Sequence, residues 1–339
     1  MDPEIYTLTQ IWLTAAVSLI FCHQIAARIP GGFARLLSIL PVIYLFTALP
    51  LRLSSVHFTG PTFFYLVWLG NFKLILFAFN QGPLSTNPPL SFFQFISIAL
   101  LPIKITKKPP SANHEKTYKS ILIFLLKCGL LALIVVLYRF RDFIHSYLLL
   151  ALYCCHAYLG VELVLAVTAE PVRAVLGLEL EPQFDEPYLA TSLQDFWGRR
   201  WNLVATGILR PTVYDPVRRM VSGNWARPVA TMATFLVSGL MHEVCFYYLT
   251  RAFPTWEVTC FFVLQGICVV AEVGVKKALG GGGWGLRKAV SRPLTVGFVA
   301  VTGGWLFFPQ VIRNGVDLKA VDEYWVLVRF VRDKLRLVL

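Results

Sequence analysis

The feature that most constrains this chain is a series of apolar runs, each close to the length that crosses a lipid bilayer. A spanning α-helix needs about 20 consecutive apolar residues. Only 15% of the 339 residues are charged, against about a quarter in a soluble domain. The sequence therefore predicts an all-α polytopic membrane protein with about eight transmembrane helices, built as a single domain over residues 1–339. The eight predicted spans are residues 8–27, 36–53, 58–79, 121–140, 144–168, 228–249, 256–275 and 293–311.

The positive charges predict which loops face the cytosol. The net charge is +12, and the cations gather in residues 104–119, 199–227 and 276–292. By the positive-inside rule all three loops are cytosolic, and the basic residues that follow the first run place the N-terminus on the opposite side. This arrangement requires that the short apolar stretch 90–103 does not cross. We expect that stretch to be re-entrant or interfacial, because it is too short for a comfortable span.

Several familiar site patterns are missing from the sequence or are better explained without a ligand. The seven cysteines include no C-x-x-C pair and fall mostly inside apolar runs, which predicts neither a disulfide framework nor a metal site. The stretch GGGGWG at 280–285 fits a dinucleotide-binding pattern formally. It follows a predicted membrane helix rather than a strand, so a flexible cytosolic linker is favoured. We expect no cofactor, no metal and no nucleic-acid partner.

Ionisable side chains inside the apolar runs are candidate site residues, because each costs a few kcal/mol to insert into a bilayer. Glu272 stands four residues before Lys276 and predicts an ion pair within one helix. His156 and Glu162 point away from each other on their helix, and they predict hydrogen bonds to other helices. Lys73 fits a structural role and a ligand-binding role equally well.

His242 is the strongest of these candidates. It lies near the middle of the run 228–249, with Glu243 beside it and Ser238 one helical turn before it. A lone histidine in a membrane helix is more often a hydrogen-bonded structural residue than a catalyst. The helix alone therefore leaves both interpretations open.

A second polar segment strengthens the functional interpretation. LQDFWGRRWN, at 193–202, contains aromatic residues, Asp195, two arginines and Asn202. If the segment has only a structural role, it is an interfacial helix with Trp197 and Trp201 at the level of the lipid headgroups. The basic residues that follow, up to residue 227, are all arginine, and guanidinium groups bind phosphates in a bidentate manner. The segment therefore suggests a phosphate-bearing substrate.

The two segments together resemble a known family. FWGRRWN at 196–202 and SGLMHE at 238–243 resemble the membrane-bound O-acyltransferase superfamily, whose members pair an Asn in a Trp-rich loop with a membrane-embedded His. NFKLILFAFNQGPLS at 71–85, LPIKI at 101–105, EPYLATSLQDFWGRRWN at 186–202 and TGGWLFFPQ at 302–310 are similar to the plant wax synthases, the jojoba-type long-chain-alcohol O-fatty-acyltransferases, over essentially the whole chain. Plant acyl-CoA:sterol acyltransferases and diacylglycerol acetyltransferases share these motifs, which leaves the acceptor and the oligomeric state open.

The resemblance implies the membrane-bound O-acyltransferase fold and acyl transfer from fatty acyl-CoA, a co-substrate, to a long-chain or other lipid alcohol in the endoplasmic reticulum membrane. It implies that His242 is the general base and Asn202 its partner. The other residues expected at the site are the supporting Glu243, Asp195, Trp197 and Trp201 and the acyl-CoA-binding Arg199, Arg200, Arg210, Arg218, Arg219 and Lys73.

Three other mechanisms or functions are compatible with parts of the sequence. A lipid or ion transporter would use His242, Glu162 and Glu272 as a proton path, but the sequence shows no inverted repeats or paired broken helices. A non-catalytic lipid-binding protein is a further alternative. A covalent route would use Cys245, three residues after His242. We expect direct transfer instead, because a thiol in an apolar span resists ionisation and the donor is already an activated thioester.

Overall fold

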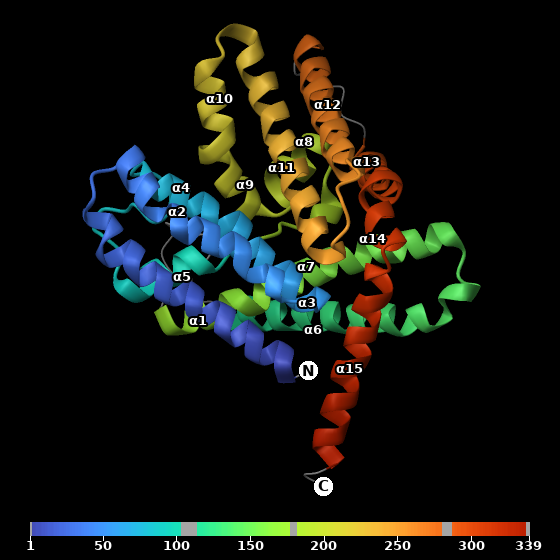
Figure 1. Cartoon of the computed structure of the whole chain (residues 1–339). Helices are drawn as coiled ribbons and strands as arrows, with labels where there is room; N and C mark the ends of the chain where they lie inside the picture. Colours follow the sequence, from blue (N-terminus) through green and yellow to red (C-terminus); the bar gives the residue numbers. More distant parts are fainter. Residues whose placement is uncertain (1, 103–113, 177–181, 280–286, 337–339) are drawn as a thin grey trace.

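The computed structural model describes residues 2–102, 114–176, 182–279 and 287–336. Every regular element in these ranges is helical (Figure 1). Within them, seven helical stretches are long and apolar enough to cross a membrane, which confirms an all-α polytopic membrane protein. The predicted linker at 280–285 lies outside the described residues, as does much of the predicted lysine-rich loop. The seven stretches are Pro3–Arg28, Phe33–Arg52, Val56–Ala78, Ile121–Phe143, Ser146–Thr168, Gly223–Thr250 and Glu257–Ala278.

These stretches are built from a few long helices and several short ones. The third stretch is a continuous helix whose middle part, η3, is a π-helix. The bounds are α1 (Asp2–Gln24), α2 (Phe33–Ala48), α3 (Val56–Thr62), η3 (Phe63–Gly70), α4 (Asn71–Ala78), α6 (His114–Leu137), η4 (Tyr138–Phe143), α7 (Ser146–Leu176), α11 (Ala226–Thr250) and α12 (Glu257–Ala278).

The eighth predicted span, 293–311, differs from the prediction. It is divided into α13 (Lys288–Thr302), the π-helical η9 (Gly303–Phe307) and the short α14 (Pro309–Arg313). Pro309 has no N–H to continue the preceding helix, and it occupies the start of α14, where a missing donor costs nothing. The segment is therefore a broken helix, and it is not among the seven long apolar helices of the described ranges.

The stretch 90–102 forms no helix long enough to be among the seven candidate spans of the described ranges, so its failure to cross the membrane stays a prediction. Its helix is α5 (Phe92–Leu100), which begins at a capping box formed by Ser91 and Gln94. Nine residues give a helix about 14 Å long, against a hydrocarbon core about 30 Å thick. Lys73 lies under the end of α5, and its Nζ donates to the carbonyl oxygens of Ile98 and Leu101, both at 2.6 Å. A buried cation at this position stabilises the C-terminal carbonyl groups of α5.

The arginine-rich segment, predicted as a loop, is largely helical. Three elements follow one another without a break: α9 (Leu203–Leu209), the π-helical η7 (Arg210–Tyr214) and α10 (Asp215–Met220). In Figure 1 this helix runs beside α11 and in the opposite direction. The last turn of α10, the first turn of α11 and the last turn of α12 lie at the same end of this bundle. The arginines and lysines of these turns are therefore gathered at one end, as the positive-inside rule requires.

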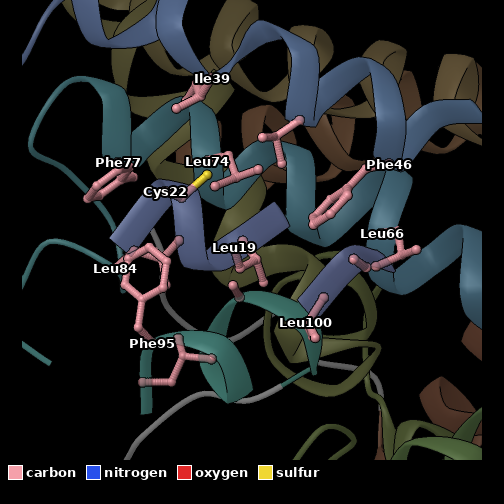
Figure 2. Packing of buried hydrophobic residues seen from close by; sticks show 14 of the residues in the cluster. Leu19, Cys22, Ile39, Phe46, Leu66, Leu74, Phe77, Leu84, Phe95 and Leu100 are labelled. Atoms are coloured by element: carbon pink, nitrogen blue, oxygen red, sulfur yellow. The ribbon is translucent and has the colours of Figure 1, made fainter. Parts of the chain in front are cut away.

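The largest apolar cluster lies between the N-terminal helices (Figure 2). Leu19 and Cys22 of α1 meet Phe46 of α2, Leu74 of α4 and Phe95 of α5. Because lipid tails are as apolar as these side chains, the cluster contributes to stability through close packing rather than through removal from water. It fixes the position of the helix that contains η3.

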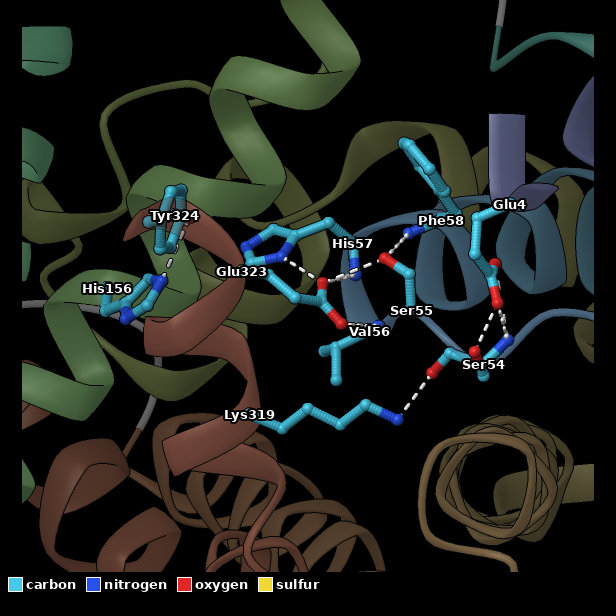
Figure 3. Close-up of polar contacts among 10 residues, drawn as sticks. All are labelled: Glu4, Ser54, Ser55, Val56, His57, Phe58, His156, Lys319, Glu323 and Tyr324. Atoms are coloured by element: carbon cyan, nitrogen blue, oxygen red, sulfur yellow. Dashed lines mark hydrogen bonds and ion pairs between the residues drawn. The ribbon is translucent and has the colours of Figure 1, made fainter. Parts of the chain in front are cut away.

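The last helix, α15 (Val316–Arg336), is attached to the start of α3 by one carboxylate (Figure 3). Glu323 accepts hydrogen bonds from the backbone N–H groups of Val56 at 2.7 Å and His57 at 3.0 Å. It also accepts from the Ser55 hydroxyl at 2.8 Å and lies 2.7 Å from Nδ1 of His57. These are the N–H groups that lack a partner within the helix, so Glu323 caps α3 from another part of the chain.

Candidate active site

The SGLMHE segment lies on α11, where it makes close contact with α12. A Cβ atom placed on Gly239 would lie 2.9 Å from the Cα of Thr259, so only glycine permits the observed approach. One turn later, Glu243 is 2% exposed, and its Oε1 accepts a hydrogen bond from the N–H of Thr259 at 3.2 Å. Thr259 is in the first turn of α12, where the N–H groups have no partner within the helix. Gly239 and Glu243 therefore join α11 to α12.

His242 lies in an enclosure of aromatic rings. Its ring stacks on Phe262 at a centroid distance of 4.4 Å. It meets the rings of Trp68 at 5.1 Å and Phe307 at 5.5 Å, both edge to face. Those residues come from α12, η3 and η9, so three segments that are remote in sequence meet around one imidazole.

The hydrogen bond of His242 determines its tautomer. Nδ1 lies 2.7 Å from the backbone oxygen of Ser238, one turn earlier on α11. A carbonyl oxygen can only accept, so Nδ1 carries the proton. The other nitrogen, Nε2, then has a lone pair and is the group able to accept a proton.

Trp197 reaches this enclosure from η6 (Phe196–Arg200), a π-helical turn of the FWGRRWN segment. Its indole N–H donates to Oε1 of Gln265 at 3.1 Å, and Nε2 of Gln265 donates to the hydroxyl of Thr302 at 2.9 Å. The Trp197 ring meets the ring of Phe262 at 5.8 Å, and Phe262 stacks on His242. The predicted tryptophan-rich segment and the predicted histidine are thus connected through a shared aromatic ring.

Asp195 and Arg200 hold the segment in shape. The carboxylate of Asp195 accepts from Nε of Arg200 at 2.9 Å and from the N–H of Thr191 at 3.1 Å. Partial burial favours a higher pKa for Asp195, but these hydrogen bonds outweigh it, and its pKa is lowered. Arg200 also donates to the backbone oxygen of Asp185 at 3.0 Å. In this structure Arg200 therefore binds protein groups from both sides.

Asn202 forms the start of α9. Its backbone has a φ of 38°, in the left-handed region that Asn tolerates better than most residues. Its Oδ1 accepts from the N–H of Ala205 at 3.1 Å, as a helix cap does. Within the described ranges, no hydrogen bond involves the Nδ2 donor of Asn202, and none joins Asn202 to His242. The helix that Asn202 begins contributes Leu209 to the apolar cluster around Trp68.

The predicted acyl-CoA-binding cations differ in burial and in their partners. Lys73 is 1% exposed and, like Arg200, donates to protein groups. Arg199 and Arg210 are exposed, and Arg210 lies 4.0 Å from Asp215. Arg218 and Arg219 are exposed at the end of α10.

The other polar groups in the apolar runs serve the packing of helices. Glu272 pairs with Lys276 at 2.5 Å, as predicted, and also accepts from the N–H of Leu193 at 2.8 Å. Glu162 of α7 pairs with Lys127 of α6 at 2.6 Å. His156 lies 3.2 Å from the hydroxyl groups of two tyrosines on other elements. The prediction of bonds between helices is confirmed for both residues.

The partners of His242 and one residue that supports them were not predicted from the sequence. No sequence pattern distinguishes Trp68, Phe262 and Phe307, because aromatic residues are common throughout the apolar runs. Gln265 could have been recognised from the sequence. It is a polar side chain inside an apolar run and is 0% exposed, and a buried amide in such a place predicts a hydrogen-bonded partner on another helix.

Comparison with known proteins identifies what this chain is similar to. Residues 180–264, which include the FWGRRWN segment and His242, match the model of the membrane bound O-acyl transferase family. A long-chain-alcohol O-fatty-acyltransferase of Simmondsia chinensis is 52% identical over 99% of this chain and 98% of its own length. A probable long-chain-alcohol O-fatty-acyltransferase 1 of Arabidopsis thaliana is 47% identical, over 95% of this chain and 96% of its own.

An acyl-CoA–sterol O-acyltransferase 1 of Arabidopsis thaliana is also similar, with 44% identity over 94% of each chain. Identity at this level over nearly whole chains leaves no doubt about kinship. The chain belongs to the membrane bound O-acyl transferase family.

Proposed function

We propose that this protein esterifies a long-chain fatty alcohol with the acyl group of a fatty acyl-CoA, and so forms a wax ester in the endoplasmic reticulum membrane. The observation that carries the proposal is His242. Its Nδ1 proton is held by the Ser238 carbonyl, which leaves Nε2 as a base inside an aromatic enclosure. The relatives named for long-chain alcohols match this chain along almost its full length, which supports the choice of acceptor.

The reaction needs a base because an alcohol is a poor nucleophile. Nε2 of His242 takes the hydroxyl proton while the alcohol oxygen attacks the carbonyl carbon of the thioester. Negative charge develops on the carbonyl oxygen, and the Nδ2 donor of Asn202 stabilises it. The carbon–sulfur bond then breaks, and the CoA thiolate takes the proton back from the imidazolium. The products are the ester and CoA, with no net proton released.

The surroundings of His242 suit both substrates. The acyl chain and the alcohol approach through the lipid, and the aromatic rings limit the access of water that would hydrolyse the thioester. Arg199, Arg210, Arg218 and Arg219 are exposed and remain proposed binding groups for the CoA phosphates. Lys73 and Arg200 remain proposed as well, and they would have to release their present protein partners.

The transfer is direct in this proposal. Cys245 packs in the apolar cluster that contains Trp68 and Tyr248. Among the described residues, no cation pairs with its thiol that would favour a thiolate. Supporting roles are proposed for Glu243, which joins α11 to α12, and for Asp195, Trp197 and Trp201, which shape the segment that ends at Asn202.

The test is a competition assay in microsomes that contain the protein. A fatty alcohol, a sterol and diacylglycerol are offered together with one labelled fatty acyl-CoA, and the products are identified by mass spectrometry. We expect wax ester as the main product and none with His242→Ala at equal protein level. Sterol ester as the main product would replace the proposed acceptor with that of the sterol-acylating relative. Normal turnover by His242→Ala would refute the role of the histidine.

A further inference from the structure

The indole N–H of Trp68 is an unexplained polar group on a ring that contacts His242. The side chain is 4% exposed, and its Nε1 is buried without a hydrogen-bond partner among the described residues. A buried tryptophan usually finds an acceptor for its N–H. An unpaired buried donor costs stability, and in native proteins such groups often mark a catalytic position or an unoccupied binding site.

The position of Trp68 points to the site rather than to a packing defect. The residue lies in η3, a π-helical stretch, and such stretches are frequent at functional sites. Its ring stands at 88° to the imidazole of His242, with centroids 5.1 Å apart. A donor without an acceptor and a base with a free lone pair thus lie on two rings in contact.

The chemistry of an indole restricts what this group can do. Its N–H is a donor only, so it cannot receive the proton of the alcohol. It can donate to an oxygen that gains negative charge, and the thioester carbonyl is such an oxygen. Asn202, the other proposed donor, begins a helix whose Leu209 packs in the same apolar cluster as Trp68.

We propose that Trp68 is a catalytic residue whose indole N–H donates a hydrogen bond to the thioester carbonyl oxygen as the alcohol attacks, so that Trp68 and Asn202 form a two-donor oxyanion site. The proposal rests on the acyl transfer proposed above. The N–H waits unpaired in the free protein and acquires its acceptor with the substrate. No bond beyond those of the acyl transfer is made or broken.

The test compares Trp68→Phe with the wild type for turnover and thermal stability. Removal of a single donor of this kind lowers kcat about 10²-fold, and KM for acyl-CoA should change little because the bond strengthens in the transition state. Phenylalanine is smaller than tryptophan, so the variant loses buried contacts and its melting temperature should fall slightly, although an unpaired buried donor is also removed. A loss of kcat far larger than this loss of stability is the expected result.

Two further variants control this test. Trp12→Phe makes the same change in a partly buried tryptophan whose ring contacts Tyr65, and it should keep the wild-type rate. Benzothienylalanine at position 68, introduced by nonsense suppression, keeps the ring shape and replaces the N–H by sulfur. It should reproduce the loss of kcat even where Trp68→Phe fails to accumulate.

The outcomes separate this inference from the proposed function. A wild-type kcat in both position-68 variants, with His242→Ala inactive, would overturn the role of Trp68 and leave the acyl transfer intact. Full activity of the benzothienylalanine protein beside a slow and less stable Trp68→Phe protein would show that Trp68 only fills space. Turnover by His242→Ala would overturn both proposals.

Discussion

Replacing Gly239 by alanine should slow the enzyme more than it destabilises the fold. The added Cβ would lie 2.9 Å from the Cα of Thr259 and 3.3 Å from the Cβ of Phe262. Ordinary contacts of this kind begin at 3.4 Å. The first neighbour is backbone, which cannot rotate away, so α12 must move by about 0.5 Å, the difference between 3.4 and 2.9 Å.

The magnitude follows from what that movement changes. Overpacking costs about 1–3 kcal/mol, and alanine regains up to about 1 kcal/mol over glycine in a helix. The net loss of stability should therefore be near 1 kcal/mol. The hydrogen bond from the N–H of Thr259 to Glu243, already 3.2 Å long, would be broken. Phe262 would move relative to His242, and since a misplacement of 1 Å can cost about 10²-fold in rate, we expect kcat to fall about tenfold.

The assay measures ester formation and thermal unfolding of purified protein in detergent. Gly274→Ala is the matched control, because Gly274 lies on α12 and its Cβ would meet nothing within 4 Å. That variant should keep wild-type turnover and stability or gain slightly in stability. If Gly239→Ala keeps the activity and the melting temperature of the wild type, the close contact between α11 and α12 does not position His242, the proposed base.

Four other predictions follow from the described contacts. Asn202→Ala should lower kcat more than it raises KM for acyl-CoA, and a pure rise in KM would make Asn202 a binding residue. Cys245→Ala should keep most activity, with intersecting lines when both substrates are varied; an inactive variant together with a trapped acyl-protein would establish a covalent route. Acceptors for N-glycosylation engineered into residues 104–119, 199–227 and 276–292 should stay unmodified in cells, whereas efficient modification would reverse the predicted topology. Partial burial favours a raised pKa for Glu323, but the hydrogen bonds from His57, Val56 and Ser55 lower it from 4.5 to about 2. A carboxyl group whose pKa is lowered on folding stabilises the fold at pH values above its ordinary pKa. The free energy of unfolding of Glu323→Gln at neutral pH should therefore be lower than that of the wild type, by about 1–2 kcal/mol after allowance for partial solvation. This difference should vanish as the pH falls from 4.5 toward 2, and a constant difference would refute the ionic origin.

The sequence could predict the membrane class, and it singled out the histidine on which the proposed function depends. Apolar length alone sets the number of spans approximately, and a histidine in the middle of a span is rare enough to be noticed. Both inferences depend on residues close together in the chain.

The rest depends on contacts between remote segments. Trp68, His242 and Phe307 meet only after several helices have packed, and no local pattern marks an aromatic residue that will face an imidazole. The roles of Lys73 and Arg200 were equally hidden, since a cation that binds a carbonyl oxygen and one that binds phosphate look the same in sequence. Pro309 could have indicated a break in the helix, because proline cannot continue a helix, but the apolar composition around it suggested a continuous span.

The hydrogen bond between the imidazole of His242 and the backbone oxygen of Ser238 affects which mutations this site can tolerate during evolution. Many catalytic histidines are oriented by a carboxylate, and a point mutation can remove that partner. Here the acceptor is a main-chain oxygen one turn away, which every residue type at position 238 supplies as long as the helix persists. The orientation of the proposed base is thus protected from side-chain mutation at position 238. A search for an acidic partner in related sequences would accordingly overlook the group that holds the imidazole in place.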